Sequence, residues 1–141
     1  MNAQARASGQ KLDLNTAEKC ARESVAMYES LNTQNSVFAV GAFVTLGSVL
    51  MKRGKLIEGE SFLRRGLDVS EKQAQKNYAR IIPNWIALTE NLVAQKRIAE
   101  AQILSQRAVD NAQAHLGEGN SITKNAVENL AKINKIATTK R

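Results

Sequence analysis

A repeat of 42 residues is the feature that most constrains how this chain can fold. Apolar and small residues recur at this spacing in five parallel series. The series are Leu14/Leu56/Ile98, Ala17/Gly59/Ala101, Cys20/Phe62/Leu104, Ser24/Gly66/Ala108 and Val25/Leu67/Val109. A second set, Phe43, Leu46, Gly47 and Leu50, recurs as Trp85, Leu88, Thr89 and Leu92, and in part as Val127, Leu130, Ala131 and Asn134. A period of this length indicates stacked repeats that bury a continuous core.

Composition places these repeats in an all-α protein. The 141 residues suffice for one domain, and 43% apolar residues with only 4% aromatic residues are typical of helices packed on small side chains. No stretch approaches the roughly 18 uninterrupted apolar residues of a membrane span, and the first ten residues lack the apolar core of a signal peptide. We therefore expect a cytoplasmic protein without a membrane span, although a mature secreted or periplasmic form would look the same.

Apolar positions spaced three and four residues apart predict amphipathic helices joined by short turns. Within a domain of residues 13–138, we expect a helix at 14–31, helix hairpins at 36–76 and 82–116, and a capping helix at 121–137. Residues 1–12 are expected to be a flexible or partial segment, and residues 139–141 a tail. Gly54 is expected in a turn, and Pro83 predicts a break near Ile82 because proline inside a helix kinks the chain.

The helix at 14–31 lacks an apolar partner in the sequence before it. One repeat back from Leu46 and Leu50 lie Gln4 and Ser8, which are polar. The apolar face of this helix is therefore partly exposed, covered by a second chain, or part of a longer array.

The internal spacing resembles that of the tetratricopeptide repeat (TPR), in the longer form found in kinesin light chains and their bacterial relatives. Phe43, Leu46, Gly47 and Leu50 carry the resemblance, together with Gly59, Gly66 and the counterparts one repeat later. Residues 115–121 and 127–131 are similar to the family's leucine-glycine turn and Asn-Leu-Ala helix, with Asn120-Ser121 in place of the usual His-Pro. The resemblance implies an α-solenoid of antiparallel helix hairpins, a TPR-like superhelix that binds protein partners.

Catalytic chemistry finds little support in the sequence. With one histidine and one cysteine, the chain offers neither a zinc cluster nor an ordinary Cys-His pair. Cys20 is expected in the core, and His115 is expected to satisfy carbonyl groups at a helix end. We therefore predict no enzymatic activity, no metal and no cofactor.

In TPR proteins the first helix of each hairpin lines a concave groove, and the resemblance places candidate partner-binding residues on these helices. They are Val44, Ser48, Met51 and Lys52 in one repeat, Ile86, Glu90 and Val93 in the next, and Asn125, Glu128, Asn129 and Lys132 in the capping helix. An apolar floor flanked by lysines suits a peptide with apolar anchors and acidic flanks. The alternative is that some of these residues pack as ordinary core between hairpins.

Three functions follow from this pattern. The first is a protein-protein interaction module that binds a peptide or protein partner through the groove. The second is a structural protein that homo-oligomerises through its unpaired N-terminal helix. The third is a nucleic-acid-associated basic repeat protein, since the net charge is +7. Nucleic acid is disfavoured because neither base-stacking aromatic residues nor a known reading motif accompanies the charge.

Overall fold

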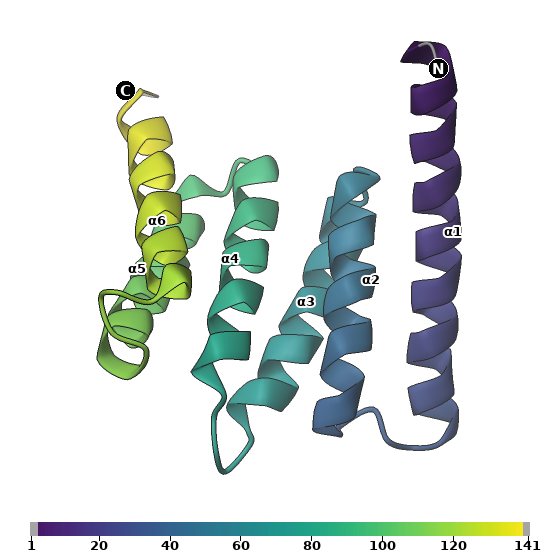
Figure 1. Ribbon diagram of the computed structural model, residues 1–141, viewed down its shortest axis with the longest axis horizontal. Coiled ribbons are helices and arrows are strands. Elements are labelled where there is room, and N and C mark those ends of the chain that lie inside the picture. The colour runs from purple at the N-terminus through teal and green to yellow at the C-terminus, as the bar shows by residue number, and fades with distance from the viewer. Residues whose placement is uncertain (1–2, 140–141) are drawn as a thin grey trace. The chain divides into compact units, whose positions relative to one another are not determined.

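The computed structural model describes residues 3–139, with side chains from residue 13 onward. This part of the chain contains six α-helices, one short 3-10 helix and no strand (Figure 1). The elements are α1 (Ala3–Ser30), η1 (Val37–Ala39), α2 (Val40–Lys52), α3 (Leu56–Glu71), α4 (Tyr78–Ala94), α5 (Ile98–His115) and α6 (Ser121–Thr139). The predicted all-α fold of antiparallel helix hairpins is confirmed.

The helices form two compact units, an N-terminal unit (Met1–Val69) and a C-terminal unit (Ser70–Arg141). In the N-terminal unit α1 packs against α2, and a short turn joins α2 to α3. Gly54 lies in this turn with a φ of 81°, a left-handed conformation that glycine adopts without a steric penalty. The core of the unit contains Ala21, Val25, Ala39, Phe43, Leu46 and Leu50.

The hairpin of α2 and α3 depends on a close approach at Gly47. A Cβ atom added to Gly47 would lie 2.7 Å from Leu63 Cγ and 2.9 Å from the Gly59 carbonyl oxygen. Both distances are shorter than a normal carbon contact, so only glycine fits between the two helices at this point. The recurrence of small residues in the sequence therefore reflects the contact distance between helices.

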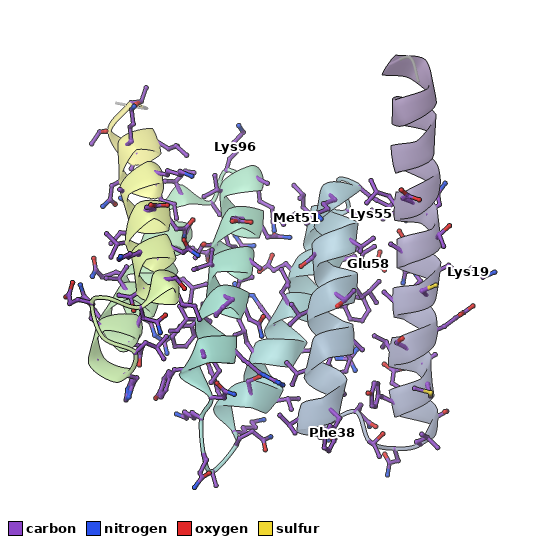
Figure 2. All side chains as sticks on the ribbon, in the orientation of Figure 1. Lys19, Phe38, Met51, Lys55, Glu58 and Lys96 are labelled. Atoms are coloured by element: carbon purple, nitrogen blue, oxygen red, sulfur yellow. The ribbon has the colours of Figure 1, made fainter. Side chains whose placement is uncertain are left out.

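An ion-pair network around Glu18 holds α1 to the turn between α2 and α3. The Glu18 carboxylate is only 9% exposed and accepts hydrogen bonds from Arg22 at 2.9 Å, Arg53 at 3.0 Å and Lys55 at 3.3 Å. Arg22 also pairs with Glu58 on α3. Lys55 and Glu58 both point toward α1 (Figure 2). The hydrogen bond from Arg22, followed by the contact with Lys55, holds the pKa of the Glu18 carboxyl below its usual range, although burial opposes this effect.

In the C-terminal unit, α5 packs against both α4 and α6, and α4 also contacts α6. Lys96 occupies the turn position equivalent to Gly54 and has a φ of 67°, so the left-handed turn recurs with the repeat. Asn120 caps α6, because its side-chain oxygen accepts a hydrogen bond of 2.8 Å from the Ile122 N–H. Asn120 thus supplies a helix cap where the resembled family has histidine.

Two helix boundaries differ from the sequence prediction. α1 begins at Ala3 and not at residue 14, and residues 3–12 are rich in Ala, Gln, Arg and Lys, which favour helix without needing an apolar face. α4 begins at Tyr78 and runs through Pro83 without the predicted break. Burial of Ile81 and Ile82 explains this continuity, because their packing outweighs the cost of the missing proline N–H. Residues 1, 2, 140 and 141, from the predicted terminal segments, lie outside the described residues.

Cys20 is exposed, which corrects the prediction that it lies in the core. Its neighbours on α1, Ala21 and Val25, are buried against α2, whereas Cys20 lies beyond the edge of that contact. The core of the N-terminal unit covers only one side of α1, and the wider apolar stripe seen in the sequence is not all buried.

Replacement of Gly47 by alanine should destabilise the protein by about 1 to 3 kcal/mol, because the added Cβ overlaps Leu63 and the Gly59 carbonyl. Urea denaturation followed by circular dichroism measures the change. Gly41→Ala in the same helix is the control, since no atom lies within 4 Å of its added Cβ. Equal stability of the Gly47→Ala variant and wild type would contradict the close contact.

Glu18→Gln should remove a pH-dependent part of the stability. Because the folded-state pKa of Glu18 is lowered, its contribution is present above the unfolded carboxyl pKa of about 4.3 and is lost as the pH falls through the folded value. The free energy of unfolding of wild type should therefore exceed that of Glu18→Gln at pH 7, and the two should converge below about pH 4. A difference that is the same at both pH values would show that the charge of Glu18 does not stabilise the fold.

Candidate functional site

A groove lies between α4 and α6 in the C-terminal unit. Its volume is about 510 Å³, and both helices contribute side chains to it. The groove is lined by Pro83, Ile86, Glu90 and Val93 from α4 and by Ile122, Asn125, Glu128, Asn129, Lys132, Ile133 and Ile136 from α6. Both helices pack against α5 and also contact each other, and the groove lies between them.

All seven residues that the sequence nominates on these two helices line this groove. They are Ile86, Glu90, Val93, Asn125, Glu128, Asn129 and Lys132. The lining also contains Pro83 and three further isoleucines, Ile122, Ile133 and Ile136, of which Ile133 is fully buried. The reason for this convergence is that positions three, four and seven apart share one face of a helix.

The groove is apolar along its length and charged along its sides. Ile86 and Val93 from α4, with Ile122 and Ile136 from α6, are partly exposed apolar side chains that a bound segment can cover. Glu90, Glu128 and Lys132 are exposed and supply two carboxylates and one ammonium group. The arrangement can hold apolar side chains and orient neighbouring polar ones.

Asn129 lines the groove, but its side chain also connects three helices. Its Nδ2 donates hydrogen bonds of 2.8 Å to Thr89 Oγ1 on α4 and 3.2 Å to Ser105 Oγ on α5. The Thr89 hydroxyl in turn donates to the Ile86 carbonyl at 2.6 Å. Thr89 and Ser105 are fully buried, so this network satisfies polar groups inside the unit and fixes α6 against α4 and α5.

Sequence reasoning missed Thr89 and Ser105, although a signal for them exists. Thr89 occupies the repeat position of Gly47, and Ser105 occupies that of the buried Leu63. Two polar residues at core positions within one repeat indicate a buried partner, and Asn129 is that partner.

The remaining nominated residues lie on α2 of the N-terminal unit. Val44 packs against α3, since a Cβ added to Gly66 would lie 3.0 Å from Val44 Cγ2. Ser48 and Met51 are half-buried and Lys52 is exposed. Val44 thus contributes to the packing of its own hairpin.

His115 stacks on Tyr78, with ring centroids 3.8 Å apart and an angle of 3° between the ring planes. This contact joins the end of α5 to the start of α4. Nearby, Trp85 Nε1 donates a hydrogen bond of 2.9 Å to Glu71, and the Arg107 guanidinium lies 5.4 Å from the centroid of the Trp85 ring. These contacts are those of a packed helix end.

The described part of the chain offers neither a metal-binding cluster nor a membrane-spanning helix. Within residues 3–139, no group of three or more His, Cys, Asp or Glu side chains is placed to hold a metal ion. None of the described helices is both long enough and apolar enough to cross a membrane.

The fold is similar to that of a solved protein. The crystal structure of BtubC (BKLC) from P. vanneervenii matches with a TM-score of 0.65 and 17% sequence identity. The match covers 98% of this chain and 52% of BtubC, so the chain spans about half the length of that protein. No family model and no curated protein matches the sequence. The chain has a TPR-like helical-repeat fold, and at this identity the similarity establishes the fold alone.

Asn129→Ala should destabilise the C-terminal unit by about 1 to 3 kcal/mol, because it leaves the buried Ser105 hydroxyl without its donor and removes one partner of Thr89. Urea denaturation gives the free energy of unfolding. Asn125→Ala on the exposed side of the same helix serves as the control and should change it by less than about 0.5 kcal/mol. Equal effects of the two substitutions would contradict the bridging role of Asn129.

Proposed function

We propose that this chain is a non-catalytic protein-interaction module that holds a segment of a protein or peptide partner in the groove between α4 and α6. The observation that carries the proposal is the row of partly exposed apolar side chains on both walls of one groove. The TPR-like fold supports it, because stacked hairpins of this class present such grooves as binding surfaces.

The dimensions of the groove indicate the length of the partner segment. From Pro83 to Val93 the α4 wall spans ten residue steps, or about 15 Å at the helical rise. A segment of about five residues in extended conformation, or about three turns of helix, covers this distance. Two or three apolar anchors are therefore enough to fill the groove, and each buried methylene contributes about 0.8 kcal/mol before ordering costs.

The charges around the groove bear on the chemistry of the flanking residues. The net charge of +7 attracts acidic partners at long range. Within the groove, however, Glu90 and Glu128 face the ligand space together with Lys132. The partner is accordingly an apolar segment with flanks of mixed charge, in which a basic residue meets the carboxylates and an acidic residue meets Lys132.

A selection of displayed random peptides on the immobilised protein tests this proposal. Wild type should enrich peptides with two or three apolar anchors, and the Ile86→Glu, Val93→Glu double variant should lose at least about tenfold in affinity for them, because it places two carboxylates on the apolar wall. Isothermal titration calorimetry measures the affinities, and circular dichroism checks the fold of the variant.

Ile103→Glu is the matched control, since Ile103 is an exposed apolar residue on α5 outside the groove lining. This variant should bind the selected peptides as wild type does. Equal losses for the control and the groove variant, or peptides that bind both as well as wild type, would exclude the groove as the binding site.

A further inference from the structure

The six helices alternate between two kinds of repeat position. By the 42-residue spacing, α2, α4 and α6 are equivalent to one another, and we call them leading helices; α1, α3 and α5 are likewise equivalent, and we call them trailing helices. A leading helix and the trailing helix that follows it form one hairpin. Within residues 3–139, therefore, α1 is a trailing helix without a leading helix before it, and α6 is a leading helix without a trailing helix after it.

The side of α1 that a leading helix would cover is open. Ser24 is equivalent to Gly66, which packs against Phe43 and Val44 of α2. Met27 is 52% exposed, whereas its equivalent Val69 on α3 is only 7% exposed. Ala17 and Ser24 are partly exposed and Cys20 is exposed on the same helix. The repeat has thus placed packing residues on α1 that nothing covers in the described part of this chain.

The outer side of α6 shows the complementary feature. Val127 is 43% exposed, whereas its equivalents Phe43 and Trp85 are 1% and 5% exposed. Ala131 is exposed, whereas its equivalent Thr89 is fully buried. In α2 and α4, the residues at these two repeat positions contact the trailing helix of the same hairpin. Val127 and Ala131 are therefore the residues with which α6 would contact a trailing helix.

The open sides of α1 and α6 carry small residues at the same repeat positions that set the close approach of the helices within a hairpin. In the N-terminal unit, Gly47 of the leading helix faces Gly59 of the trailing helix. The equivalent pair in the C-terminal unit is Thr89 and Ala101, both fully buried. On the open sides the equivalent pair is Ala131 on α6 and Ala17 on α1, and two alanines leave the two helices room for the same close contact.

The chain does not form its usual turn at either open position. The turn residues Gly54 and Lys96 lie one repeat apart and have φ values of 81° and 67°. The equivalent positions, 12 and 138, lie inside the helices α1 and α6. Within the described residues, therefore, the chain does not form the short turn that would bring a covering helix onto α1 or α6.

We infer that the cover is a second copy of this chain, with α6 of one copy docking as the leading helix for α1 of the next. The contact reproduces the hairpin interface that each unit already contains, with Ala131 of one copy against Ala17 of the other. Because the two surfaces differ, the association is head-to-tail and extends the repeat from copy to copy, as a ring or an open array. It uses Val127 and Ala131 on the outside of α6 and does not depend on the proposed function of the groove.

Analytical ultracentrifugation over a range of concentrations tests the inference. Wild type should show a sedimentation coefficient that rises with concentration. Ala17→Arg and Ala131→Arg should each remain monomeric alone, because each blocks one of the two surfaces. Mixed together they should form a one-to-one dimer through the single pair of intact surfaces. Ala114→Arg, the same substitution at an exposed site on α5, is the control and should associate as wild type does.

Several outcomes of this experiment would overturn the inference. The inference is wrong if wild type stays monomeric at the highest soluble concentration. It is also wrong if a mixture of Ala17→Arg and Ala131→Arg contains only monomers. An association that Ala17→Arg abolishes and Ala131→Arg preserves would show instead that α1 pairs with α1 of a second copy.

Cys20 provides a second measurement on the protein without any change to α1. Its thiol is exposed on the open side of α1, so docking of α6 covers it. Alkylation of Cys20 should slow as the concentration of wild type rises, and should not slow for Ala131→Arg, although Ala131 lies on a different helix. Equal concentration dependence in both proteins, or none in wild type, would contradict head-to-tail docking.

Discussion

The close contact between a leading and a trailing helix is the constraint on which the rest of the structure depends. At Gly47 the two helices of the first hairpin approach so closely that a single added carbon overlaps both Leu63 and the Gly59 carbonyl. The second hairpin keeps the same register with Thr89 and Ala101 fully buried. Because this contact fixes how α4 packs on α5, it also determines which side of α4 remains available to form the groove with α6.

Most of the fold is readable from the sequence because helix packing repeats with the chain. The 42-residue series predict the hairpins and the turn at Gly54, and the resemblance to the TPR implies the face of α4 and α6 that carries Ile86, Val93 and Glu128. What the series do not predict are effects of the surrounding structure. Pro83 is held inside α4 by buried neighbours, and Cys20 is exposed because it lies off the side of α1 that packs in the core of the N-terminal unit.

The candidate site shows the same division between periodic and local information. The apolar and charged residues of the groove follow a regular pattern, since they share helix faces at spacings of three, four and seven residues. This pattern does not predict the hydrogen-bond partners of a buried polar side chain. The hydrogen bonds from Asn129 to Thr89 and Ser105 depend on three helices that meet at one point. The same residue therefore belongs both to the groove lining and to the interior of the unit.

The most direct test of partner binding in the groove between α4 and α6 is a methyl NMR titration of isoleucine-labelled protein with a selected peptide. The groove holds Ile86, Ile122, Ile133 and Ile136, while Ile57 and Ile103 are exposed on α3 and α5 and do not line it. Binding in the groove predicts that the methyl signals of the first four shift and that those of Ile57 and Ile103 stay unchanged. Shifts centred on Ile57 or Ile103, with the groove signals unchanged, would contradict it.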